Sequence, residues 1–244
     1  MYKFFRNALI LAASSFALAA NAAPMAYSVN SDSGDPSTED SLFLIDLETG
    51  HGHRRGELAT GVVDDVRRDT EGLAFSSDGT LWGLDDNSRS LFPINLSSGS
   101  VSLAKEIPLP TFQAGGSNDF GMTFDCEDNL FVTSVATRTL YQVEMNGTVT
   151  AVGSQGALGA NISAIAAIGR PTQLYGLGNG QNQNGETDAP NLYSIDVDTG
   201  VATMIGPLGA SVGEYNQGGL AFDFTGNLWA ITDRRIINNS IEDL

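Results

Sequence analysis

Residues Thr70 to Gly99 read TEGLAFSSDGTLWGLDDNSRSLFPINLSSG and contain three short apolar segments separated by polar turns. The apolar segments are 72–75, 81–84 and 91–94, and the intervals between them are rich in Ser, Asp, Asn and Gly. Short apolar runs bounded by such residues are typical of β-strands. This stretch therefore predicts three successive strands, and the rest of the chain is organised around copies of it.

The same pattern recurs at four places in the chain. Its first marker is a small residue that opens a short apolar strand: GLAF at 72–75, GMTF at 121–124, AIAA at 164–167 and GLAF at 219–222. The copies start 49, 43 and 55 residues apart, and an aromatic residue follows each small residue by 10 or 11 positions. These aromatic residues are Trp82, Phe131, Tyr175 and Trp229. A strand-built repeat of about 40–50 residues is typical of β-propeller blades.

A third strand and a glycine turn complete the repeat. The third strands begin at Leu42, Leu91, Leu140 and Leu192, and the glycines that follow them are Gly50, Gly99, Gly147 and Gly200. Asp46, Asn95 and Asp196 stand where such strands end. A short polar side chain at that position can bond its own backbone two residues further on, so we interpret these three residues as turn formers.

The residue types at each marker suit a propeller. Small residues fit the first strand, which lies beside a narrow central channel, and the aromatic residue of the second strand can pack between blades. The chain before residue 70 supplies strands two to four of a blade, and the chain after Asn216 supplies strands one and two. We therefore predict an all-β propeller of five blades with an incomplete or irregular last blade. A truncated chain would also explain the irregular end.

Residues 1–22 have the pattern of a secretory signal peptide. Lys3 and Arg6 precede an apolar run from Ala8 to Ala20, and a small-x-small cleavage site ends at Ala22. The run is too short and wrongly flanked for a membrane span. We therefore expect a single propeller domain over residues 23–244, exported to the periplasm or the extracellular space and without a membrane span.

The composition is strongly acidic. The chain holds 12 Lys and Arg residues against 29 Asp and Glu residues, a net charge of −17, and loss of Lys3 and Arg6 with the signal peptide changes this to −19. Such a surface repels nucleic acid and anionic lipid, so we exclude both as partners. Cys126 is the one cysteine of the chain, so packing rather than disulfides must stabilise the fold.

One position of the repeat is always Asp or Asn. It lies three residues before the small residue and is occupied by Asp69, Asn118, Asn161 and Asn216. In propellers the loop before the innermost strand opens on the same face as the loop between strands two and three, so these side chains would gather at the channel mouth. Oxygen ligands gathered around one axis predict a Ca²⁺ site, whereas the structural alternative is that Asn and Asp merely end loops.

Other polar residues are expected on the same face. Glu71 and Asp119 lie beside the Asx positions, and the loops between strands two and three carry Asp85, Asp86, Asn87, Asn179 and Asp233, which we assign to ligand binding. His51 and His53 would share one face of a strand and imidazole binds transition metals, but no third ligand accompanies them. We therefore interpret this pair as a cluster at a loop edge.

The phrase GLAF-x-x-DG-x-LW, complete in Gly72–Trp82, resembles the blades of the bacterial NHL, YVTN and gluconolactonase-like propellers. It recurs at 219–229 with Thr225 in place of the Asp, and the resemblance covers most of residues 26–233. The gluconolactonase-like members hold a divalent cation with a Glu, two Asn and an Asp from different blades. The resemblance implies that Asn118, Asn161 and Asn216 supply amides and that Asp69 or Glu71 supplies the carboxylate. The chain departs from that pattern because both carboxylates come from one blade.

Three functions stay open on the sequence. The first is an exported, non-enzymatic propeller that binds a small molecule or a protein partner on its loop-rich face. The second is a calcium-dependent lactone or ester hydrolase, in which Glu71 or Asp69 activates water and the cation polarises the carbonyl. The third is a structural extracellular protein that self-associates through an open blade edge.

Overall fold

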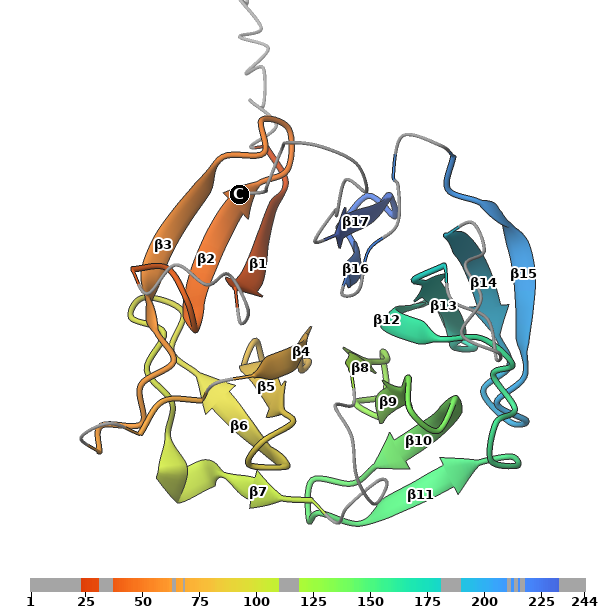
Figure 1. Cartoon of the computed structure of the whole chain (residues 1–244), viewed down its shortest axis with the longest axis horizontal. Coiled ribbons are helices and arrows are strands. Elements are labelled where there is room, and N and C mark those ends of the chain that lie inside the picture. The colour runs from red at the N-terminus through yellow and green to blue at the C-terminus, as the bar shows by residue number, and fades with distance from the viewer. Residues whose placement is uncertain are drawn as a thin grey trace, which may run out of the picture.

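The computed structural model describes residues 23–30, 37–62, 65–67, 69–109, 119–180, 190–209, 212, 215 and 218–232. Within these residues the chain forms antiparallel sheets arranged around a common centre (Figure 1). The one helical element there is a short 3-10 turn, η1 (Leu103–Lys105). The expected all-β propeller is therefore confirmed.

Each sheet is built from consecutive strands. The first contains β1 (Met25–Asn30), β2 (Ser41–Asp46) and β3 (Gly52–Glu57). The second contains β4 (Thr70–Phe75), β5 (Leu81–Asp85), β6 (Ser90–Ile94) and β7 (Ile107–Pro108). The third contains β8 (Phe120–Phe124), β9 (Leu130–Ser134), β10 (Thr139–Val143) and β11 (Val149–Val152). The fourth contains β12 (Ile162–Ile168), β13 (Gln173–Gly178), β14 (Asn191–Ile195) and β15 (Ala202–Pro207), and the last contains β16 (Gly218–Phe222) and β17 (Leu228–Thr232).

The repeat markers fall on the strands that the sequence predicts. The four small-residue phrases form the innermost strands β4, β8, β12 and β16, and the aromatic residues lie on the second strands β5, β9, β13 and β17. Four sheets of three or four strands form blades, and the two-stranded β16–β17 sheet is the expected incomplete last blade. The first blade begins at the second-strand position, because β1 pairs with β2 as β5 pairs with β6.

The innermost strands need small residues because they pack against one another. A Cβ atom on Gly72 would lie 2.9 Å from the Cβ of Met122 on the next inner strand. A Cβ on Gly121 would lie 2.6 Å from Thr133 Oγ1 and 2.9 Å from the Cα of Ala164. The neighbouring strand, rather than the channel axis alone, therefore restricts these positions. Gly219 on β16 has no atom within 4 Å of its Cβ position.

The second-strand aromatics pack between blades, as expected. Tyr27 meets Phe75 edge to face with ring centroids 5.9 Å apart, and Tyr175 meets Phe222 in the same way at 5.6 Å. In each pair the partner is the last residue of the inner strand in the following sheet. Such pairs add about 0.5–1.5 kcal/mol to the stabilisation that comes from buried area.

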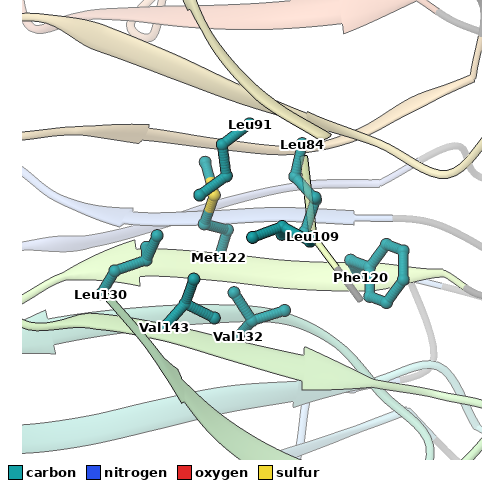
Figure 2. Packing of buried hydrophobic residues seen from close by; sticks show 8 residues of the cluster. All are labelled: Leu84, Leu91, Leu109, Phe120, Met122, Leu130, Val132 and Val143. Carbon is teal, nitrogen blue, oxygen red and sulfur yellow. The ribbon is translucent and has the colours of Figure 1, made fainter. Parts of the chain in front are cut away.

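Each junction from the first sheet to the last contains its own apolar cluster. The cluster between the second and third sheets is drawn in Figure 2, where Leu84 and Leu91 face Met122 and Leu130. Similar clusters join the first sheet to the second, the third to the fourth, and the fourth to the last. Each fully buried leucine contributes about 1.5–3 kcal/mol, so these junctions supply the stability that disulfides supply in many exported proteins.

The expected turn formers are confirmed. Asp46 Oδ1 accepts the Glu48 N–H at 2.9 Å, Asn95 Oδ1 accepts the Ser97 N–H at 3.0 Å, and Asp196 Oδ1 accepts the Asp198 N–H at 3.0 Å. Each bond reaches two residues along the chain and closes the turn from the third strand to the fourth.

We expect Gly121→Ala to destabilise the protein by about 1–3 kcal/mol, because the added methyl group meets the backbone of the next inner strand. Gly219→Ala is the matched control, and we expect it to change the free energy of unfolding by no more than about 0.5 kcal/mol. Urea denaturation of the two variants measures both values. Equal effects would contradict close packing of β8 against β12.

Candidate functional site

The two ends of the propeller differ in how their polar residues are used. At one end, which we call the upper end, the first and third strands of each blade begin and the second strand ends. In the second sheet this end is marked by Thr70, Asp85 and Ser90, because Thr70 pairs with Asp85 and Asp85 pairs with Ser90. The lower end carries the turns between strands one and two and between strands three and four.

At the lower end, two carboxylates are hydrogen-bonded within their own turns. Hydrogen bonds from Thr199 and Asp198 hold the pKa of the exposed Asp196 below its usual value. The Trp229 indole N–H and the Thr225 hydroxyl do the same to the pKa of Asp223. These carboxylates are satisfied within their own turns, so their role is structural.

The upper end gathers the buried polar side chains. Of those among the described residues, Asp125 alone lies at the lower end. The others are Asp40, Ser41, Thr70, Asp85, Ser90, Thr133, Ser134, Thr137, Thr139, Asn161, Ser163, Asn179 and Asn191. Burying a polar group is unfavourable unless it is hydrogen-bonded, so this concentration at one end needs a structural or a functional reason.

Part of the reason is structural, because the same backbone turn and hydrogen bond recur before the third strand of three blades. The residue before the third strand adopts a left-handed conformation in three blades, with φ of 52° at Asp40, 52° at Arg89 and 50° at Arg138. The carbonyl of each accepts the N–H of a leucine that follows the fourth strand, at 2.8, 2.8 and 3.1 Å. These leucines, at positions 58, 109 and 158, are buried. Their spacing of 51 and 49 residues is visible in the sequence, but our markers did not include it.

A second polar group lies at the upper end of the second sheet. The largely buried Arg67 bridges Asp65 at 3.0 Å and Glu106 at 2.8 Å, with its guanidinium 5.9 Å from the centroid of the Phe92 ring. The Ser90 hydroxyl donates to the other carboxylate oxygen of Glu106. This network was not visible in the sequence, because Arg67 and Glu106 are 39 residues apart.

Asp85 is the most deeply buried carboxylate of this group. It is 1% exposed, and its Oδ1 accepts the Ser88 N–H at 2.6 Å, whereas its Oδ2 has no hydrogen-bond partner among the described residues. Burial raises the pKa of Asp85, the negative charge of Asp69 adds to the rise, and Ser88 and Arg67 oppose it. An acceptor oxygen thus remains unused inside the upper end.

Asp69 and Asn87 are brought together beside Asp85. Asp69 has a φ of 79°, its Oδ2 accepts the Asn87 amide at 3.2 Å, and its carbonyl accepts the Asp86 N–H at 3.1 Å. Glu71 is half-buried and lies at the β-bulge where the pairing of β4 with β5 shifts register. Four of the expected site residues, Asp69, Asp85, Asp86 and Asn87, therefore form one group in a single blade.

Asn161 forms a separate group with Asn179 and a neighbouring blade. Its carbonyl accepts the Asn179 N–H at 3.2 Å, and its side-chain Oδ1 accepts the Arg138 Nε–H at 2.8 Å. Ser163, the second residue of β12, is 3% exposed and its hydroxyl has no hydrogen-bond partner among the described residues. Arg138, which the sequence did not single out, thus joins the third blade to the fourth.

The remaining expected residues can be placed only in part. Asn118, Asn216 and Asp233 lie outside the described residues. Within the described ranges, no group of three or more His, Cys, Asp or Glu side chains is arranged to hold a metal ion. The pair His51 and His53 lies exposed at the outer strand β3, away from the innermost strands. Cys126 is exposed and lies in the lower turn after β8.

Comparison with known proteins supports the fold. No protein-family model matches the sequence, and no curated protein is detectably similar. Among solved structures, a protein of unknown function from Bacteroides thetaiotaomicron matches 78% of this chain and 50% of its own, at 12% identity and a TM-score of 0.51. A chain of the nidogen/laminin complex matches 80% of this chain and 67% of its own, at 18% identity and a TM-score of 0.50. Virginiamycin B lyase from Staphylococcus aureus matches 80% of this chain and 57% of its own, at 17% identity and a TM-score of 0.45.

These likenesses show the class of the molecule by its fold, a β-propeller, as the blade pattern predicts. At such low identity they establish the fold alone. The chain spans only about half to two thirds of the length of the matched chains. Among the described residues, no helix combines the length and the apolar character needed to cross a membrane.

The raised pKa of Asp85 predicts how stability depends on pH. Because the pKa of Asp85 is raised, the native state binds a proton more readily than the unfolded chain. The ionised carboxylate therefore lowers the free energy of unfolding at a pH above its folded pKa. This loss of stability fades as the pH falls toward the ordinary pKa of an aspartate. Asp85→Asn keeps the Oδ1 bond to Ser88 and should melt no lower than wild type at pH 7. Any excess of its melting temperature over that of wild type should shrink as the pH falls from 7 to 4.

The control for this variant is Asp196→Asn, for which we expect a pH dependence of stability in the opposite direction. The pKa of Asp196 is lowered, so Asp196→Asn should melt below wild type at pH 7, and this deficit should vanish as pH falls. Thermal denaturation followed by circular dichroism across this range measures both trends. If Asp85→Asn instead melts below wild type at pH 7 and this difference fades on acidification, the result would contradict a raised pKa for Asp85.

Proposed function

We propose that this chain is an exported binding propeller whose upper end holds a small molecule or a segment of a partner protein. The observation that carries the proposal is the concentration of buried polar side chains at that end, among which Asp85 and Ser163 each keep a buried hydrogen-bonding atom without a partner among the described residues. These atoms are Asp85 Oδ2 and Ser163 Oγ, which lie at the upper end of the second and the fourth sheet. Since buried polar groups are normally paired, a bound molecule is a natural partner for them.

The chemistry of these atoms indicates the kind of ligand. An ionised carboxylate only accepts hydrogen bonds, and a serine hydroxyl both donates and accepts. The ligand should therefore carry hydroxyl, amide or amine hydrogens, and the acidic character of the chain favours a neutral or cationic molecule over an anion. Sugars, polyols and amines meet this description.

The test is an NMR titration of the isotope-labelled protein with glucose, N-acetylglucosamine, ethanolamine and lysinamide. We expect at least one of them to shift backbone signals of 85–88 or 161–163, at the upper end. Asp85→Asn keeps the turn bond but loses the acceptor and should weaken that binding about tenfold or more. Asp196→Asn, at the lower end, should bind unchanged. Shifts confined to the lower turns, or no shift with any probe, would contradict the proposal.

A calcium-dependent lactone or ester hydrolase is the second candidate. It is favoured by the proximity of the Asp69 and Asp85 carboxylates to each other and to Asn87, which offers oxygen donors from two loops. In this mechanism Glu71 or Asp69 would act as the base. A cation bound at Asn161 would have to displace Arg138 from Oδ1, so the geometry supports this candidate less well.

Calcium chloride is therefore a further probe in the same titration. The hydrolase candidate requires shifts at 69 and 87 and a rise in melting temperature that chelator reverses. Loss of both responses in Asp69→Asn would assign the ion to this loop. No response to millimolar calcium would exclude the candidate and leave the binding propeller in place.

A further inference from the structure

Both histidines of the chain lie at one place in the fold. The sequence contains two histidines, His51 and His53. They stand at the start of β3, the outermost strand of the first sheet, which lies at the rim of the ring (Figure 1). The turn from β2 to β3 is at the lower end, so a site here is separate from Asp85 and Ser163 and does not depend on the proposed function.

Strand pairing determines how the two imidazoles lie. His53 pairs with Leu44 of β2. The Asp46 N–H donates to the His51 carbonyl at 3.0 Å, which extends the pairing by one residue before β3 begins. In an extended strand, residues two apart point to the same face and are separated by about 6.6 Å. The two imidazoles therefore lie side by side on one face, and both residues are exposed.

The residues next to the histidines along the chain do not separate the two imidazoles. Gly52, between them, has no side chain. Arg54 points to the opposite face of β3, where its Nε–H donates to Ser41 Oγ at 2.9 Å. The positive charge of Arg54 is thereby directed away from the face that carries the histidines.

The carboxylate across the strand pair is already engaged. Asp46 lies opposite His51, and its Oδ1 accepts the N–H groups of Glu48 and Thr49 at 2.9 and 3.2 Å. Asp46 therefore belongs to the turn, which agrees with the lack of a three-residue metal group of acidic, histidine or cysteine side chains in the described part of the chain. A cation here would have two protein ligands, both of them imidazoles.

The fold does not require histidine at either position. In the third sheet the Glu144 N–H donates to the Thr148 carbonyl at 2.9 Å, and Thr150 pairs with Gln142. Thr148 and Thr150 therefore have the places that the two histidines have in the first sheet, and both are exposed. Threonine forms such a strand well, so the imidazoles are not needed to build the outer strand.

We propose that His51 and His53 together bind one divalent transition-metal ion, with water molecules completing its coordination. Imidazole suits copper, nickel and zinc, and a given nitrogen site binds Cu²⁺ more tightly than Ni²⁺ or Zn²⁺. The net charge of −17 favours the approach of a cation. Since Ca²⁺ takes oxygen ligands, this site differs in chemistry from the calcium candidate near Asp69.

The test is a titration of the protein, made without a histidine tag, with copper(II) chloride and in parallel with zinc chloride. Calorimetry should report one Cu²⁺ per chain and weaker binding of Zn²⁺. Because Cu²⁺ is paramagnetic, it should broaden the backbone NMR signals of 44–46 and 51–54 before any others. An excess of calcium chloride should not displace Cu²⁺.

Variants assign the two ligands. His51→Ala and His53→Ala should each weaken Cu²⁺ binding at least about tenfold, because loss of a ligand should cost no less than loss of a residue that orients one. The matched control is the exchange Gly52→His with His53→Gly, which keeps both histidines but turns them to opposite faces. A Cβ on Gly52 would lie 3.5 Å from Phe43 Cδ1, an ordinary contact, so this variant should fold and should bind no better than His53→Ala.

A gain of binding tests the geometry independently. Thr148→His combined with Thr150→His should bind a second Cu²⁺ on the third sheet. Equal Cu²⁺ affinity of wild type and the exchange variant, broadening that starts outside the first sheet, or a single bound ion in the doubly substituted third sheet variant would overturn the proposal. No binding to wild type at submillimolar Cu²⁺ would overturn it as well.

Discussion

The close approach of the innermost strands is the constraint on which the rest of the structure depends. Gly72 and Gly121 leave room for the next inner strand to lie directly against them, which brings the blades together around the centre. That approach places each second-strand aromatic against the following blade, as with Tyr175 and Phe222, and it closes the apolar clusters between blades. With a single cysteine and no disulfide, the fold relies on this packing alone.

The fold could be predicted from the sequence because its determinants repeat. The small residue, the aromatic residue and the turn glycine recur at nearly constant spacing, so an error in aligning one copy of the repeat would have broken several matches at once. Asp46 and Asp196 were correctly read as turn formers for the same reason, since a local hydrogen bond explains them fully. The partial blades at both ends also followed from the order of the markers.

The candidate site was predictable only in part. The sequence expected Asp69, Asp85 and Asn87 on one face, and the structure brings them together because both loops belong to one blade and strand pairing joins them. It did not find Arg67 or Arg138, whose partners come from distant segments and whose position depends on packing rather than on repetition. Nor could it tell that Asn161 shares its side-chain oxygen with a guanidinium. Single positions become informative about chemistry only once their neighbours in space are known.

The central claim is that the packed inner strands hold the blades together. Native-state hydrogen exchange measures this most directly, because amides in tightly packed strands exchange only through large-scale unfolding. The account predicts that β4, β8 and β12 are the most protected strands and that β1 and β17 exchange considerably faster. Protection of β1 and β17 equal to that of β8 would contradict it, since these two strands lie outside the close packing of β4, β8 and β12.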